Sequence, residues 1–191
     1  GHAVDLARLA TVFTSSSGDT LNCHAMCEAL AAPERAVSPT RFTNSVHNAT
    51  AGYWHIATAS RAPSTSLCGF DGSFVAGLLE AAAQALAGDG LVLLVASDIP
   101  YVDPLLAQRP TPDAFGLALL LGRDEPDAVV PGAVSRWRVE LGRPGEAATP
   151  CRGPGLDGLR GAIPAARALA LLEAVVAGRE GRIVVDGQDG Q

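Results

Sequence analysis

The stretch of residues 62–87 constrains the fold most, because a strand, a tight turn and a long helix follow one another in it without a break. Ser64–Cys68 is short and has strand-forming character, and residues 69–72 have the composition of a turn. The helix predicted over residues 73–87 is apolar on nearly every side, which indicates a buried central helix. Many α/β enzymes present a nucleophile on such a strand, turn and helix. The residue at the top of this turn is Asp71.

Apolar segments elsewhere predict a mixed sheet of about five strands. Leu91–Ala96 is a continuous apolar run, as in strands that are covered on both faces. Ala114–Gly122 follows it too soon for a full crossover helix, so we expect these two strands to be antiparallel. The other predicted strands are Leu9–Thr14, Ser64–Cys68, Ser135–Leu141 and Arg182–Val185.

Helical spacing predicts further helices that cover this sheet. They span Thr20–Ala32, Ala49–Ala59 and Ile163–Ala177. The second of them carries Tyr53 and Trp54, bulky side chains that we expect to pack against a major element or a partner. A chain of 191 residues with 48% hydrophobic residues is most simply one α/β domain, residues 1–191.

Composition excludes several classes of function. All 14 basic residues are arginines, so this chain offers no Schiff-base lysine, no P-loop lysine and no Ser-Lys dyad. It has no basic run that would neutralise a row of phosphates, so we do not expect nucleic-acid binding. No apolar run approaches the roughly 20 residues of a membrane span, and no secretory signal is visible. We expect a cytoplasmic protein.

The four cysteines predict neither a disulfide framework nor a metal centre. Cys23 and Cys27 lie four residues apart beside His24, but no second pair occurs at ligand spacing. Free cysteine is among the most buried residue types, so we expect these side chains to be small core residues. No cofactor is expected.

A few polar residues are candidates for a site, each beside a structural interpretation. His47 and His55 are eight residues apart, but neither has a carboxylate nearby in sequence, so structural roles are favoured. Asp98 follows a strand at its carboxyl end, where α/β folds place their sites, although a turn-forming role is favoured. Residues 15–17 are serines, which we interpret as turn and capping residues.

Four segments, taken in order, resemble the β-ketoacyl synthase superfamily, whose members have the thiolase fold. They are SSSGD, SPTRFTNSVHNATAGYWHIAT, APSTSLCGFDGSFVAGLLEA and LVLLVASDIPYVDPLL. The resemblance covers roughly Leu9 to Gly122. It is nearest to short ketosynthase-like proteins that act as chain-length factors in aryl-polyene-type clusters. It implies a thiolase-like half that lacks its first strand.

The resemblance also exposes two departures from an active ketosynthase. Aligning Pro63 and the two residues after it with the family's GPST-x-x-STACAS run places Asp71 at the nucleophilic cysteine, with Cys68 three residues earlier. A carboxylate is a weak nucleophile and its acyl product would be a labile anhydride, whereas acyl transfer needs a thiolate. The second half of the fold, which supplies catalytic histidines and a lysine, is not in this sequence.

The resemblance therefore implies a catalytically degenerate subunit that pairs with an active ketosynthase and shapes the acyl tunnel in fatty-acid-like or polyketide (aryl polyene) synthesis. Its partners would be that ketosynthase and an acyl carrier protein, and a homodimer through Ser64–Cys68 is an alternative. Four aromatic side chains are candidates for the tunnel or the partner surface: Tyr53, Trp54, Phe70 and Phe74.

Two enzymatic alternatives stay open at this point. Asp71 on its turn could serve a stand-alone α/β hydrolase as nucleophile or base, with His47 or His55 as its partner. No oxyanion motif of the HGGG type supports this alternative. Cys68 could serve an acyltransferase if the turn were shifted, although burial in a strand would make the thiol inert.

Overall fold

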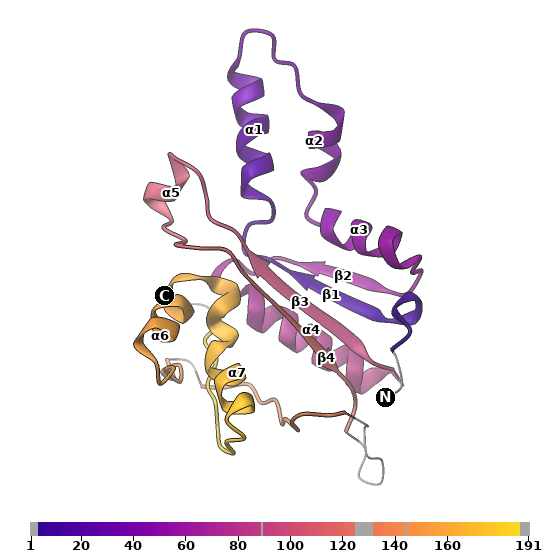
Figure 1. Ribbon diagram of the computed structural model, residues 1–191, viewed down its shortest axis with the longest axis vertical. Coiled ribbons are helices and arrows are strands. Elements are labelled where there is room, and N and C mark those ends of the chain that lie inside the picture. Colours follow the sequence, from indigo (N-terminus) through magenta and orange to yellow (C-terminus); the bar gives the residue numbers. More distant parts are fainter. Residues whose placement is uncertain (1–3, 89, 125–131, 144, 188–191) are drawn as a thin grey trace.

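The computed structural model describes residues 4–88, 90–124, 132–143 and 145–187, and it has a mixed sheet at its centre (Figure 1). Within these residues the sheet has four strands in the order β2-β1-β3-β4, rather than the expected five. β1 is parallel to β2 and β3, whereas β4 is antiparallel to β3, as predicted. Their bounds are β1 Ala10–Thr14, β2 Ser64–Leu67, β3 Val92–Asp98 and β4 Phe115–Leu121.

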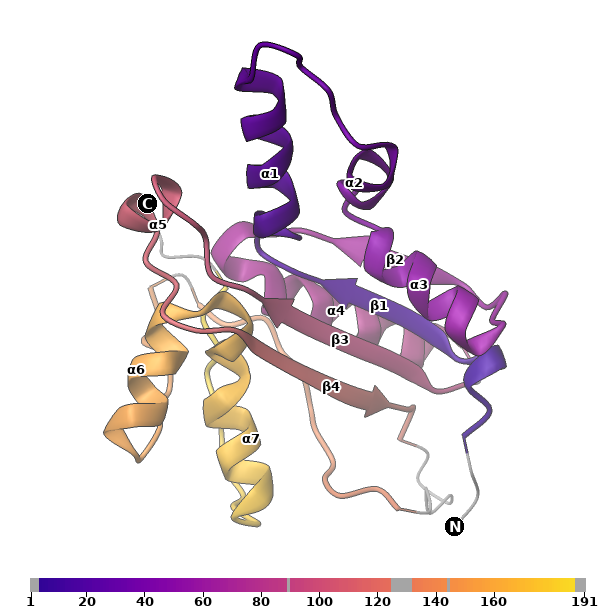
Figure 2. The ribbon, with the colours of Figure 1, turned by 45° about the horizontal axis from the view of Figure 1, so that its top comes forward.

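Two helices cover opposite faces of the sheet (Figure 2). α3 (Ala49–Thr58) packs on β1 and β2, and α4 (Ser73–Ala87) packs on the other face, chiefly on β3 and β1. The 3-10 helix η3 (Pro164–Ala168) extends the α4 layer and is followed by α7 (Leu169–Val176). α1 and α2 rise from one end of the sheet (Figure 1). The remaining helices are α1 Thr20–Ala31, α2 Pro39–Asn44, α5 Leu105–Gln108, α6 Pro154–Ala162 and the 3-10 helices η1 Leu6–Arg8 and η2 Phe70–Gly72.

The core lies between the sheet and α4. Val12 of β1, Phe74 of α4 and Leu94 of β3 are completely buried there. The predicted central helix α4 forms and packs on the sheet, but only one of its faces is buried, because Leu79 and Leu86 on the other face are 37% and 65% exposed. None of the described helices is long and apolar enough to cross a membrane.

Gly77 sets the close approach of α4 to the sheet. A Cβ atom there would lie 2.7 Å from Thr14 Cγ2 and 3.0 Å from Leu94 Cδ1. We expect Gly77→Ala to lower the free energy of unfolding by about 2 kcal/mol, because overpacking outweighs the helix propensity of alanine. Gly158→Ala in α6 is the matched control: nothing lies within 4 Å of the added methyl group, so a gain of about 0.5–1 kcal/mol is expected. Urea denaturation measures both changes, and equal effects would contradict this packing.

Two predicted strands do not form, and one predicted helix is divided into two. Residues 135–141 and 182–185 are not in strands. Within the second segment, Val184 exchanges two hydrogen bonds with Thr149, one of them through the Thr149 hydroxyl, and no ladder continues from them. The helix predicted over Ile163–Ala177 is divided into η3 and α7.

Candidate functional site

The turn between β2 and α4, which we call the elbow (residues 68–73), is held by backbone and hydroxyl contacts. The buried Ser73 hydroxyl donates to the Phe70 carbonyl at 2.7 Å and accepts from the Gly69 amide at 3.0 Å. The Thr14 hydroxyl of β1 donates to the Ser73 carbonyl at 2.8 Å. These contacts fix the elbow on the sheet, as the sequence predicted for a sharp strand-to-helix turn.

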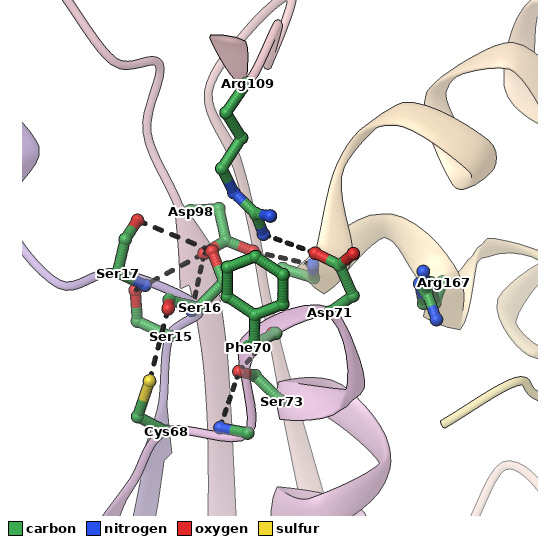
Figure 3. A network of polar contacts seen from close by, with 12 residues as sticks. Ser15, Ser16, Ser17, Cys68, Phe70, Asp71, Ser73, Asp98, Arg109 and Arg167 are labelled. Carbon is green, nitrogen blue, oxygen red and sulfur yellow. Dashed lines mark hydrogen bonds and ion pairs between the residues drawn. The ribbon is translucent and has the colours of Figure 1, made fainter. Parts of the chain in front are cut away.

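Arg109, which follows α5 in the loop between β3 and β4, lies on the elbow (Figure 3). Its guanidinium forms an ion pair and hydrogen bond with the Asp71 carboxylate. Its Cζ atom is also 3.7 Å from the centre of the Phe70 ring, in a cation–π contact. Asp71 is therefore bound to a cation, and the contacts of the described residues include none between it and His47 or His55.

Phe70 adopts a left-handed backbone conformation, with φ of 51°. A bulky side chain rarely has positive φ, and such strain clusters at functional sites. The Phe70 ring is 51% exposed and lies under the Arg109 guanidinium. The strained residue of the elbow is thus the neighbour of Asp71, and its ring contacts the same arginine.

Asp98, at the end of β3, is 3% exposed and binds several donors (Figure 3). Its Oδ1 accepts from the Ser16 amide at 2.8 Å, the Ser16 hydroxyl at 2.6 Å and the Ser15 hydroxyl at 3.3 Å. Its Oδ2 accepts from the Ala165 amide at 2.7 Å. The carboxylate therefore joins the β1–α1 turn to η3, a larger structural role than the turn residue we predicted.

A pocket of about 230 Å³ opens at the carboxyl ends of β1 and β3. His47 and Asp98 are among its lining residues. His47 Nε2 lies 2.6 Å from the Leu67 carbonyl, so this nitrogen donates, and His55 Nδ1 lies 3.1 Å from the Ser60 carbonyl. Both histidines contact backbone carbonyls, which agrees with their predicted structural roles.

The predicted turn role of the β1–α1 serines is confirmed, but their predicted capping role is wrong, because Asp19 is the N-cap of α1. Ser15 Oγ accepts from the Gly18 amide at 2.9 Å, and the Asp19 carboxylate accepts from the Asn22 amide at the start of α1.

The expectation of buried cysteines is correct only for Cys151; Cys23, Cys27 and Cys68 are exposed. β2 ends at Leu67, so Cys68 lies beyond the strand, and its thiol donates to the Ser16 carbonyl at 3.2 Å. Burial raises the pKa of the Cys151 thiol, and partial desolvation together with Cys27 raises that of Cys23. No group of three potential metal ligands occurs among the described residues.

The four aromatic candidates lie in different environments. Tyr53 on α3 is 57% exposed and donates to Asn44 Oδ1 at 2.8 Å, and Phe70 is exposed on the elbow. Trp54 is half-buried and packs edge-on against Phe13 of β1, with ring centroids 6.4 Å apart. Phe74 is completely buried in the core.

Sequence reasoning missed Arg109. It lies 38 residues from Asp71 in a proline-rich loop, and no local pattern pairs the two. Only a chemical argument could have indicated this pair. A partly buried carboxylate is stabilised by a cationic side chain, and all basic residues in this sequence are arginines.

Comparisons with known proteins agree with this geometry. The family described as "Beta-ketoacyl synthase, N-terminal domain" matches residues 3–135. A solved structure, a ketosynthase (ApeO) in complex with its chain length factor (ApeC) from Xenorhabdus doucetiae, has a similar chain with a TM-score of 0.56 and 29% identity. The match covers 64% of this chain and 51% of that one, so it spans about half of the solved chain. No curated protein gives a match.

The family match extends over more than half of the sequence and includes β1 to β4 and the elbow. The chain belongs to the family of β-ketoacyl synthase N-terminal domains.

Proposed function

We propose that this protein is a catalytically degenerate ketosynthase-like subunit that pairs with an active ketosynthase and influences the length of the acyl chain. The observation that carries the proposal is Asp71 at the top of the elbow, bound to Arg109. A carboxylate in an ion pair is a poor nucleophile, and acyl transfer from a carrier needs a thiolate. In this account the elbow is retained for its shape.

The similar solved structure supports a paired role. That structure is a complex of a ketosynthase with its chain length factor. An acyl carrier protein would deliver the substrate to the active partner.

The proposed partner surface comprises α3 and the adjacent outer edge of β2. Tyr53 and Ile56 of α3 are 57% and 77% exposed, a large apolar exposure for one short helix. β2 ends the sheet in the described structure, so its outer backbone groups are free to pair with another strand. A ketosynthase subunit would cover both features, and a second copy of this chain is the alternative occupant.

Co-purification tests the pairing. We expect the chain to elute in a 1:1 complex when it is co-expressed with a ketosynthase encoded beside it. Ile56→Glu should reduce recovery of the complex at least about tenfold, because it puts a charge into an apolar contact. Val176→Glu on α7, where the side chain is 88% exposed, is the matched control and should leave recovery unchanged. Elution of the wild-type chain alone would contradict the pairing.

A stand-alone hydrolase is the second candidate, and it rests on the elbow geometry. We expect the isolated protein to hydrolyse acyl thioesters at the background rate, with Asp71→Ala and Cys68→Ser giving that same rate. Product release from a chromogenic thioester measures this. If the wild-type rate exceeds background and Asp71→Ala lowers it, the result would favour a hydrolase that uses Asp71. If Cys68→Ser lowers it, the result would favour an enzyme that uses the Cys68 thiol.

A further inference from the structure

The loop between β3 and β4 (residues 99–114) makes two side-chain contacts with other elements and one hydrogen bond within itself. Near its start, the Thr20 hydroxyl of α1 donates to the Pro100 carbonyl at 2.7 Å. Near its end, Thr111 is 4% exposed, and its amide donates to the Arg109 carbonyl at 2.9 Å. Between these points, the Arg109 side chain extends from the loop to the elbow (Figure 3). The loop is thus joined to α1 near its start, and the Arg109 side chain makes the ion pair and the ring contact with the elbow.

That contact combines two interactions on adjacent residues. The Arg109 guanidinium pairs with Asp71 and stacks on Phe70, and the side chains of the ion pair are 22% and 27% exposed. The Nε atom of Arg109 is buried and has no hydrogen-bond partner among the described residues. A partly desolvated guanidinium with one unbonded donor depends on its remaining contacts, because removal of its counter-ion leaves a buried charge uncompensated.

We propose that Asp71 and Arg109 form a latch, which holds the 99–114 loop over the elbow and closes the position where acyl transfer would occur. This inference rests on the proposed function, since it assumes that the elbow corresponds to the nucleophile turn of a ketosynthase. Asp71 is then a positioning residue: it occupies the nucleophile position and binds the cation that covers it. Phe70, in its strained conformation, supplies the face on which the guanidinium lies.

Hydrogen exchange in the isolated full-length chain tests the latch. Arg109→Gln and Asp71→Asn should each accelerate amide exchange about fivefold in residues 99–114 and 69–72, since a partly buried ion pair contributes about 1 kcal/mol locally. Exchange in β1 should be unchanged. Arg182→Gln, which removes an ion pair with Glu146 between two other segments, is the matched control and should leave both regions as in the wild type.

The double variant makes the test specific for the pair. If Asp71 acts only through Arg109, Asp71→Asn combined with Arg109→Gln should exchange no faster than Arg109→Gln alone, which already removes both the ion pair and the contact with Phe70. Unchanged exchange in the single variants, acceleration spread evenly over the whole chain, or additive acceleration in the double variant would each overturn the latch. The measurement needs no ketosynthase, so its failure would leave the co-purification result untouched, and a failed co-purification would leave the latch standing.

Discussion

Phe74→Ala is expected to lower the free energy of unfolding by about 4 kcal/mol, because the ring is completely buried between α4 and the sheet. Urea denaturation followed by circular dichroism measures this loss of stability. With a typical m-value, the midpoint of unfolding should fall by about 2 M urea. Phe74→Leu keeps most of the volume and should cost about 1 kcal/mol, which keeps the test informative if the alanine variant fails to fold.

Phe42→Ala is the matched control for this substitution. The Phe42 ring on α2 is 66% exposed, so its removal should change stability by less than about 0.5 kcal/mol. If Phe74→Ala cost no more than this control, the account of the core would be wrong. Phe74 would then be available to contact an acyl chain, as the resemblance first implied.

Asp98→Asn is expected to destabilise the fold by about 3 kcal/mol. The carboxylate is buried and accepts hydrogen bonds with both oxygens, from Ser15, Ser16 and Ala165. An amide retains one acceptor oxygen and directs an NH₂ group at a donor, so at least one buried amide or hydroxyl loses its partner. Differential scanning calorimetry measures the loss as a fall in Tm.

Asp19→Asn is the matched control for Asp98→Asn, because it makes the same chemical change in the same region. Asp19 caps α1 with its carboxylate on the Asn22 amide, and asparagine caps helices about as well as aspartate. We expect a change below about 0.5 kcal/mol. Similar losses for the two variants would show that Asp98 does not join the β1–α1 turn to η3 as described.

The elements that the sequence predicted well are those whose local pattern and packing agree. β3 and α4 carry long apolar runs bounded by turn residues, and both form as expected. The antiparallel direction of β4 was predicted because the segment that connects it to β3 is too short for a crossover helix. Residues 135–141 alternate as a strand would, but a strand also needs a neighbour with free backbone groups, which alternation does not reveal.

The site was predictable only in part. The elbow and Asp71 were visible because their residues are contiguous. The contacts of Asp71 and Asp98 join residues that are 38 to 83 positions apart, and they were not visible. The exposure of Cys68 was also missed, since it depends on β2 ending one residue earlier than its composition indicates.

The length of the acyl product tests the central claim most directly. An active ketosynthase and its acyl carrier protein would be assayed with and without this chain, and the products measured by mass spectrometry. We predict that the chain shifts the distribution of product lengths while it forms no product in the absence of the ketosynthase. Unchanged product lengths, with the chain eluting separately from the ketosynthase, would contradict the proposed function.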